Sequence, residues 1–124
     1  MKSICEKSLV LGLAVMILSL VSLKTYAASA PYNTSSLVDL VTIYNDTSSN
    51  RTLAVNTRPT VGTGGVIVYI TKSDGTVLAS KTFPYQVSVP DLEETVPSGV
   101  IRHIVLGPNS SGQNVQGTLT YNRY

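Results

Sequence analysis

Short runs of β-forming residues with a period of two constrain the fold of this chain more than any other feature. The runs are rich in Val, Ile, Leu, Thr and Tyr, and they are separated by Gly, Pro, Asn, Asp and Ser, which are typical of turns. After residue 27, no window has the i, i+3, i+4, i+7 apolar spacing of an amphipathic helix. The pattern predicts an all-β chain with strands at residues 37–44, 52–58, 65–71, 76–83, 85–89, 100–106 and 115–124.

Two of these runs are joined by a recognisable turn. Asp74-Gly75 lies between alternating segments, and this dipeptide is a strong signal for a tight β-hairpin. In the second segment, Val77 and Phe83 share one face of the expected strand with Lys81. We therefore expect a hairpin here, with a lysine on an otherwise apolar face.

Two other runs predict the position of their strands in a sheet. The run at residues 37–44 is apolar on both faces except at Asp39, which is typical of a strand covered on both sides. The run at residues 85–89 is bracketed by Pro84 and Pro90, which cannot donate to a ladder of hydrogen bonds. We therefore expect the second run to be an edge strand.

Seven short strands at this spacing predict one antiparallel β-sandwich, Ig-like or jelly-roll-like, over residues 37–124. Residues 28–36 have no periodic pattern, and only Tyr32 among them is large enough to bury much surface. We expect a flexible, extended leader there. The alternative interpretation is an arm that docks on a neighbouring subunit by adding a strand to its sheet.

The first 27 residues have the pattern of a secretory signal peptide: a basic start, an apolar segment at residues 9–23 and small residues before Ala28. The apolar segment is shorter than the roughly 20 residues that span a membrane. We place cleavage after Ala27; cleavage after Ala30 is the competitor, but Pro31 would then follow the scissile bond. The signal has a bacterial character, so the protein is predicted to be secreted or displayed at the cell surface, without stable membrane insertion after cleavage.

Removal of this signal leaves a chain without cysteine, methionine or tryptophan. It therefore cannot form a disulfide, and its stability has to come from a well-packed core, from self-association, or from both. The remaining acidic and basic side chains are equal in number, which gives no basic footprint for nucleic acid or anionic membranes. These residues are Lys72, Lys81, Arg51, Arg58, Arg102 and Arg123, against Asp39, Asp46, Asp74, Asp91, Glu93 and Glu94.

The sequence contains no motif that predicts catalysis. His103 is the only histidine, and one histidine without cysteine cannot form a typical zinc site, so we assign it a structural or surface role. The chain has no Gly-x-Ser-x-Gly nucleophile elbow. We therefore predict a protein that is not an enzyme, with no catalytic, cofactor-binding or metal-binding residues.

Asp91, Glu93 and Glu94 form the one acidic cluster. Paired carboxylates can bind calcium or hydrolyse glycosides, but these lie between Pro90 and Pro97 and match no calcium loop, so we interpret them as part of a solvated loop.

The tyrosines after the signal favour packing in the core or at its rim over stacking on a sugar. They are Tyr32, Tyr44, Tyr69, Tyr85, Tyr121 and Tyr124. Asn-x-Ser/Thr sequons, which are glycosylation sites only in a eukaryotic secretory pathway, begin at Asn33, Asn45, Asn50 and Asn109.

The layout resembles that of small β-sandwich subunits of bacterial surface fibres, such as pilins and spore appendage proteins. The resemblance rests on the leader before Leu37 and on the closing run Val115-Gln116-Gly117-Thr118-Leu119-Thr120-Tyr121. It implies a self-associating structural subunit. The chain departs from these families because it is shorter than typical chaperone-assembled pilins and lacks both their disulfide and the N-terminal cysteines of spore appendage subunits.

Two functional interpretations follow. The first is a secreted, non-enzymatic structural or interaction protein, a fibre or matrix subunit that contacts itself or another surface protein through sheet edges. The second is a secreted binding module or effector, such as a carbohydrate-binding domain, an inhibitor or a small toxin. Its ligand surface would consist of the loops at residues 45–50, 59–64 and 107–114.

Overall fold

The computed structural model describes residues 26–123 of the 124-residue chain, and the side chains of residues 28–122. The predicted signal up to residue 25 and Tyr124 lie outside the described residues. Within this range no helix is long and apolar enough to cross a membrane. The described strands are β1 (Tyr26–Thr34), β2 (Val38–Tyr44), β3 (Arg51–Thr57), β4 (Val66–Thr71), β5 (Val77–Phe83), β6 (Leu92–Val96), β7 (Ile101–Pro108) and β8 (Val115–Arg123).

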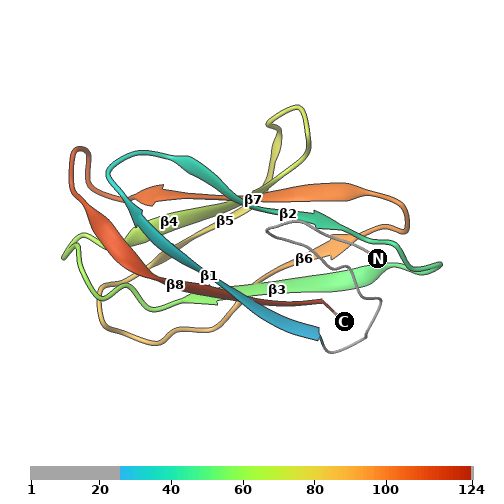
Figure 1. Cartoon of the computed structure of the whole chain (residues 1–124), viewed down its shortest axis with the longest axis horizontal. Coiled ribbons are helices and arrows are strands. Elements are labelled where there is room, and N and C mark those ends of the chain that lie inside the picture. The colour runs from blue at the N-terminus through green and yellow to red at the C-terminus, as the bar shows by residue number, and fades with distance from the viewer. Residues whose placement is uncertain (1–25, 124) are drawn as a thin grey trace.

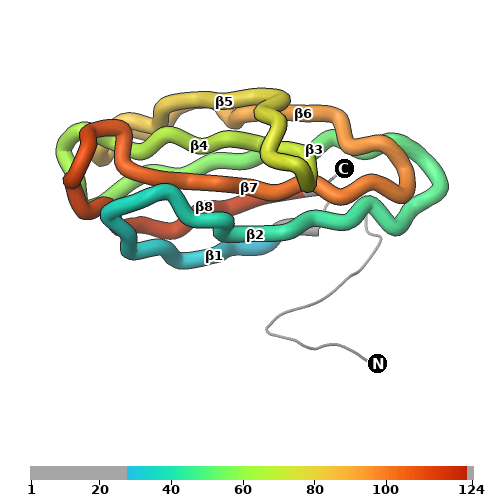
Figure 2. Tube along the Cα trace, turned by 90° about the horizontal axis from the view of Figure 1, so that it is seen from above, coloured from blue at the N-terminus to red at the C-terminus, as the bar shows by residue number. Residues whose placement is uncertain are grey.

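These strands form two four-stranded antiparallel sheets, in the orders β1-β8-β3-β6 and β2-β7-β4-β5. Figure 1 shows one sheet above the other, and Figure 2 shows the β2-β7-β4-β5 sheet face-on. The pairing is nested, because β1 pairs with β8, β2 with β7, β3 with β6 and β4 with β5. Eight strands in two four-stranded sheets with this nested pairing form a jelly roll. The predicted antiparallel sandwich is therefore confirmed, and it has the jelly-roll form.

The core lies between the two sheets and follows the period of two in the sequence. On β4, Val66, Val68 and Ile70 are completely buried, whereas Ile67 and Tyr69 on the opposite face are only partly buried. Each fully buried aliphatic side chain of this size contributes about 1.5–3 kcal/mol. The other completely buried apolar side chains are Leu53, Val55, Phe83, Val96, Ile104, Leu106, Val115 and Leu119.

The Asp-Gly turn joins β4 to β5 as predicted. Gly75 has a φ of 90°, and its N–H donates to the carbonyl of Lys72 at 3.0 Å. The Asp74 carboxylate accepts from the N–H of Thr76 at 2.9 Å. This backbone hydrogen bond, with a smaller contribution from the Thr76 side chain, lowers the pKa of Asp74. The turn is therefore held by the same residues that signal it in the sequence.

The expectation of a flexible leader at residues 28–36 is wrong for most of that segment. Residues up to Thr34 belong to β1, which pairs in continuous register with β8 from Tyr26 opposite Arg123 to Thr34 opposite Val115. The segment lacks apolar periodicity because β1 is an edge strand with Ala28 and Ala30, two small residues, on its inward face. Backbone hydrogen bonding, which composition does not reveal, defines this strand.

The expected strand at residues 85–89 is also wrong. Tyr85 and Gln86 form a turn, with Gln86 at a φ of 57° and its N–H donating to the carbonyl of Pro59 at 2.9 Å. The edge strand lies further along, at β6, in the segment that we expected to be a solvated loop. Leu92 and Val96 on β6 are buried, so a strand pattern is present there but is interrupted by glutamates.

The third correction concerns the run at residues 37–44. It forms β2, which lies at the edge of its sheet and is not covered on both sides. The register of β2 against β7 shifts between Asp39 and Val41, where Leu40 is the extra residue of a β-bulge. At the bulge the consecutive residues Leu40 and Val41 both pack against the core, so the run looks apolar on both faces when it is read with a strict period of two.

Candidate interaction surfaces

The N-terminal edge strand is anchored by one buried tyrosine. Tyr32 on β1 is 6% exposed, and its hydroxyl lies 2.7 Å from the Thr57 hydroxyl on β3. Thr57 uses its own proton to donate to the carbonyl of Thr118 at 3.0 Å, so Tyr32 is the donor in the first contact. Gly117 leaves the space for the ring, since a Cβ at that position would lie 2.5 Å from the Tyr32 oxygen. We call Thr57 and Gly117 the Tyr32 socket.

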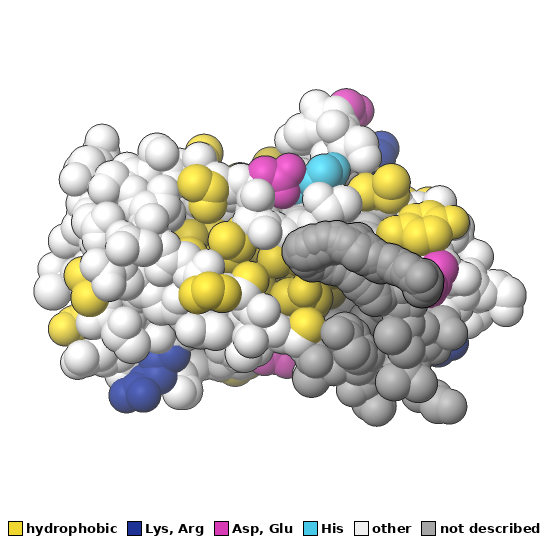
Figure 3. All heavy atoms as spheres, viewed as in Figure 1, with side chains coloured by type: hydrophobic (Ala, Val, Ile, Leu, Met, Phe, Trp, Pro, Cys, Tyr) yellow, Lys and Arg dark blue, Asp and Glu magenta, His cyan; other side chains and the backbone are white. Residues whose placement is uncertain are grey.

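One open side of the sandwich lies between β1 and β2, the edge strands of the two sheets. The inward residues of β1 that face this opening are small, namely Ala28 and Ala30. Leu37, in the connection to β2, is 60% exposed. Figure 3, which views the molecule from this side, shows hydrophobic side chains along the gap between the sheets. The β1–β2 side therefore presents apolar surface and unpaired strand edges together.

The opposite open side, between β5 and β6, has a different character. Lys81 on β5 points inward, because it pairs with the buried Val68, and its Nζ donates to the carbonyl of Pro90 at 2.7 Å. The same Nζ lies 5.7 Å from the centre of the Phe83 ring. Glu94 on β6 faces inward opposite Leu53. Inward-pointing charges are a common device against edge pairing, so this side is protected.

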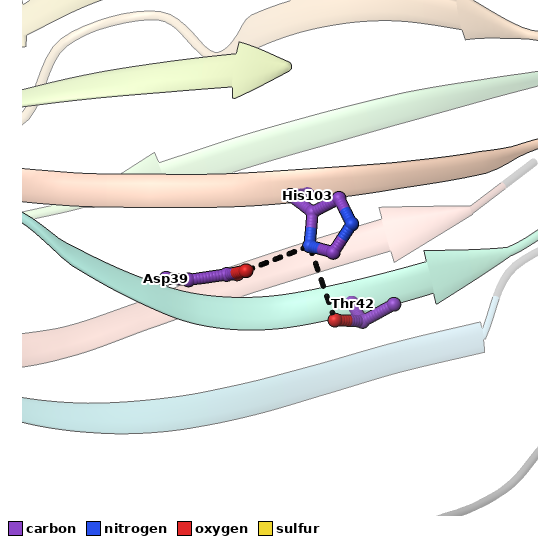
Figure 4. Close-up of polar contacts among 3 residues, drawn as sticks. All are labelled: Asp39, Thr42 and His103. Carbon is purple, nitrogen blue, oxygen red and sulfur yellow. Dashed lines mark hydrogen bonds and ion pairs between the residues drawn. The ribbon is translucent and has the colours of Figure 1, made fainter. Parts of the chain in front are cut away.

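His103 lies on the outward face of β7, where it contacts two side chains of β2 (Figure 4). Its Nδ1 lies 2.8 Å from Asp39 Oδ2 and 3.3 Å from Thr42 Oγ1. A catalytic triad places its carboxylate and its nucleophile on different nitrogens of the ring, whereas both contacts here use Nδ1. Thr42 is therefore not arranged as a nucleophile. Figure 4 shows the other ring nitrogen, Nε2, on the far side of the ring.

The strand alternation that turns His103 outward turns its neighbour Arg102 inward. Arg102 is 9% exposed, and its Nη1 donates to the carbonyl of Ile101 at 3.0 Å. Its Nε has no hydrogen-bond partner among the described residues. Arg102 was not among the site residues predicted from the sequence, although the run Val-Ile-Arg-His-Ile-Val-Leu shows a charged side chain in an apolar strand.

The three acidic residues do not converge on one site. Asp91 accepts a hydrogen bond from the Asn56 side-chain amide at 2.6 Å. Glu93 and Glu94 are successive residues of β6, so their side chains point to opposite faces of the sheet. Within the part of the chain that the structure describes, no group of three His, Cys, Asp or Glu residues is placed to hold a metal ion.

A shallow polar hollow of about 510 Å³ lies beside the Tyr32 socket, where β3 and β8 adjoin the loop after β3. Arg58, Thr60, Gln116 and Thr118 are among its lining residues. The hollow lies on the sheet that does not carry His103, so the histidine and the hollow do not form one site. No sequence motif predicts this hollow, because its lining residues Arg58 and Gln116 are far apart in the chain.

The described tyrosines do not form a common platform. Tyr32 is in its socket and Tyr121 packs partly against the core. Tyr44 and Tyr69 lie on the outer face of the β2-β7-β4-β5 sheet, and Tyr85 lies in the turn after β5. Packing is therefore the main role of Tyr32 and Tyr121, whereas Tyr44 is 50% exposed.

The three loops that were expected to form a ligand surface lie at two different ends of the sandwich (Figure 1). The loops at 59–64 and 107–114 adjoin each other, since the N–H of Gly64 donates to the Gln113 side chain at 2.9 Å. The loop at 45–50 instead contacts the β6–β7 connection, where the N–H of Gly99 donates to the carbonyl of Asn45 at 2.8 Å. A ligand could contact the first two loops together, but not all three.

Asn45 is completely buried and fixes its loop. Its Nδ2 donates to the carbonyls of Ser49 at 2.9 Å and Val96 at 2.8 Å. Its Oδ1 accepts from the N–H and the hydroxyl of Thr47, at 3.0 and 2.6 Å. This sequon asparagine is therefore part of the fold, whereas Asn33, Asn50 and Asn109 are exposed.

Comparison with known proteins gives matches to solved structures only. No family model matches the chain, and no curated protein matches it. The chain is similar to a protein from Bacillus endospore appendages, described as a family of disulfide-linked pili, with a TM-score of 0.44 and 13% identity. That similarity covers 86% of this chain and 95% of the appendage chain.

Two further similar structures come from virus particles. One is from the T13 particle of IBDV, with a TM-score of 0.42 and 11% identity. The other is from the Gt strain of infectious bursal disease virus, with a TM-score of 0.30 and 16% identity. Each similarity covers 82% of this chain but only 31% of the viral chain. At these values the likeness concerns the arrangement of strands alone.

Proposed function

We propose that this protein is a non-enzymatic structural subunit, exported to the cell surface or beyond, whose copies associate through the β1–β2 side of the sandwich. The observation that supports this is the unequal protection of the two open sides. Lys81 and Glu94 point inward at the β5–β6 side, whereas the inward residues of β1 whose side chains are described are the uncharged Ala28, Ala30 and Tyr32. Inward charges are one of the devices by which monomeric sheet proteins protect their edges, so the side where the described inward positions of β1 lack them is the one more open to contact with another chain.

The edge strands also restrict the form of that contact. Pro31 removes one hydrogen-bond donor from β1, and the bulge at Leu40 interrupts the first half of β2. The regular part of β2 after the bulge runs from Val41 to Tyr44. A strand from another copy could therefore form backbone hydrogen bonds only along this short segment of β2. The apolar surface between β1 and β2 would supply the rest of the contact.

The proposal is tested with two lysine substitutions on adjacent residues of β1. Ala30→Lys adds an inward charge that mimics Lys81, whereas Ser29→Lys adds the same charge on the outward face. Sedimentation velocity of the exported protein should show concentration-dependent association for the wild type and for Ser29→Lys. Ala30→Lys should sediment as a monomer. Circular dichroism would show whether each variant is folded.

Leu37→Asp is the second variant, because Leu37 is exposed and its replacement should leave the fold intact. It should weaken association in the same assay. A wild-type protein that stays monomeric at every concentration, or equal effects of Ser29→Lys and Ala30→Lys, would contradict the proposal. Deletion of residues 28–36 is not a clean test, since it would remove Tyr32 from its socket and expose β8.

A binding module is the second candidate function, and the hollow beside the Tyr32 socket favours it. Arg58 is an exposed cation in its lining, and Thr118 adds an exposed hydroxyl group. A glycan array probed with the monomeric Ala30→Lys protein would show binding under this interpretation, and Arg58→Ala should remove that binding. An array without signal would exclude glycans as the ligand.

A further inference from the structure

The turn between β4 and β5 projects from the sandwich. In Figure 1 it rises from the outer face of the β2-β7-β4-β5 sheet, and in Figure 3 the same projection carries an acidic and a basic side chain. Residues 72–78 are all exposed. At the tip, no atom beyond the chain neighbours lies within 4 Å of the position that a Cβ on Gly75 would take. We call residues 72–76 the projecting turn, and its tip is free to contact another molecule.

The projecting turn has a fixed shape and presents two opposite charges. The N–H of Lys72 donates to the carbonyl of Thr76 at 2.9 Å and closes the base of the turn. The N–H of Thr76 donates to the Asp74 carboxylate, also at 2.9 Å. This hydrogen bond lowers the pKa of Asp74, so the carboxylate is ionised at neutral pH. A preformed pair of charges loses little conformational freedom on docking, which suits the projecting turn to recognition.

The polar hollow lies on the opposite outer face of the sandwich, and its charges complement those of the projecting turn. Among the described residues that line the hollow, Arg58 is the one that carries a charge. Asn56, another lining residue, donates to the Asp91 carboxylate at 2.6 Å, so an anion lies beside the hollow. Asn56 and Arg58 are two residues apart, which is about 7 Å along an extended chain. Lys72 and Asp74 are likewise two residues apart in the projecting turn.

We propose that the projecting turn of one copy docks in the polar hollow of the next copy, with Asp74 against Arg58 and Lys72 against Asp91. The other lining side chains are mostly hydroxyl and amide groups, which can form hydrogen bonds with the backbone of the turn. In the reversed orientation like charges would face each other, so the charge pattern fixes how the turn enters. The contact extends the self-association proposed above to surfaces outside the β1–β2 side.

The contact joins different surfaces of the two copies, so it runs head to tail. The projecting turn and the hollow belong to different sheets and lie on opposite outer faces. Such a contact repeats from copy to copy and builds an open stack unless its rotation closes a ring. A turn of five residues buries far less than the roughly 1,200–2,000 Å² of a stable complex. The contact is therefore weak by itself, and it becomes effective when the β1–β2 side already links the copies.

Cysteine cross-linking between two different variants tests this contact, because the chain has only one cysteine of its own. In a Cys5→Ser background, an isotope-labelled Ser73→Cys protein is mixed with an unlabelled Thr118→Cys protein, which puts one thiol on the turn and the other in the hollow. Under mild oxidation, mass spectrometry should detect several-fold more mixed dimer than when Ser48→Cys replaces Thr118→Cys. Ser48 is also exposed but lies in the loop at 45–50. Equal yields from the two mixtures would overturn the proposal.

Charge substitutions in the same assay test how the turn is recognised. Asp74→Asn keeps an acceptor for the N–H of Thr76 and removes the charge, and Arg58→Gln removes its partner in the other copy. Each should lower the yield of mixed dimer several-fold, whereas Arg51→Gln at the other end of β3 should leave it unchanged. A yield that ignores both Asp74→Asn and Arg58→Gln would contradict this docking. All variants also carry Ala30→Lys, so a failure of the proposed β1–β2 contact would leave the cross-link intact.

Discussion

The hydroxyl groups of Tyr32 and Thr57 lie 2.7 Å apart and tie the N-terminal edge strand to the middle of its sheet. The link passes over β8, which lies between β1 and β3, and continues to the carbonyl of Thr118 on that strand. One side chain therefore connects three strands. Because β1 otherwise has small residues on its inward face, this contact decides how firmly the strand is held.

Tyr32→Phe should lower the free energy of unfolding by about 0.5–1.5 kcal/mol at neutral pH, because it removes the hydrogen bond to Thr57 and keeps the ring in place. Urea unfolding followed by circular dichroism measures the change. Tyr85→Phe is the matched control, since Tyr85 lies in the turn after β5 and is only partly buried. A change of equal size in both variants would show that the Tyr32 socket has no special role.

Tyr32 also makes stability depend on alkaline pH. Burial raises the pKa of its phenol above 10.0, and the hydrogen bond with Thr57 offsets part of this rise. In the unfolded chain the phenol ionises near pH 10, so its contribution is fully present below that pH and is lost as pH rises through the folded-state pKa. The wild type should lose stability over this range, and Tyr32→Phe should lose less. Parallel curves for the two proteins would contradict the assignment.

Gly117→Ala should destabilise the domain by about 1–3 kcal/mol, since the added Cβ would lie 2.5 Å from the Tyr32 oxygen and 2.9 Å from its Cζ atom. The cost should shrink in a Tyr32→Ala background, where the clash is absent. A double-mutant cycle from urea unfolding measures this coupling. Additive effects of the two substitutions would show that Gly117 is not required for the ring.

Asn45→Ala should cost about 1–3 kcal/mol, because it leaves the carbonyl of Val96 and the N–H of Thr47 without their partner at a buried site. Asn50→Ala in the same loop is the control and should change stability by no more than about 0.5 kcal/mol. Thermal unfolding of both variants measures the difference. An Asn45→Ala protein as stable as the Asn50→Ala protein would show that the buried network contributes little.

Lys81→Val should convert the protected β5 edge into an associating one. The substitution leaves the strand pattern intact and removes the inward charge, so light scattering should show faster aggregation at equal concentration. Ser80→Val, on the outward face of the same strand, is the control for added apolar surface. If Ser80→Val aggregates as fast as Lys81→Val, the orientation of the charge is unimportant.

The sequence predicted the class of the fold well, because the period of two is a local signal. Strands β2, β3, β4, β5, β7 and β8 lie within a few residues of their expected positions, and the Asp74-Gly75 hairpin is present. Lys81 shares a face with Phe83 as expected, but Val77 does not, because the register shift between Ile70 and Thr71 places it opposite Thr71, where it is exposed. These features depend on residues that are neighbours in the chain.

The features that the sequence did not predict depend on distant neighbours. Glu93 and Glu94 interrupt the apolar pattern of β6, so the strand was not recognised in the sequence. Its position is set by pairing with β3. Small residues give β1 no strand pattern in the sequence. The strand forms because it pairs with β8 in a continuous ladder of backbone hydrogen bonds. The burial of Asn45 depends on the carbonyl of Val96, which is 51 positions away in the chain. The predictions of export and of a non-catalytic role remain predictions.

The nested pairing sets the order in which this chain can close. The β4–β5 hairpin joins adjacent strands across a tight turn, while β1 and β8 stand at opposite ends of the described chain. Closing short loops is fast and entropically cheap, so we expect folding to begin at the central hairpin and to proceed outwards. The ribosome makes β1 first and β8 last among the described strands, so β1 cannot pair until β8 has been made. Each newly made molecule thus passes through a stage in which its first strand has no intramolecular partner.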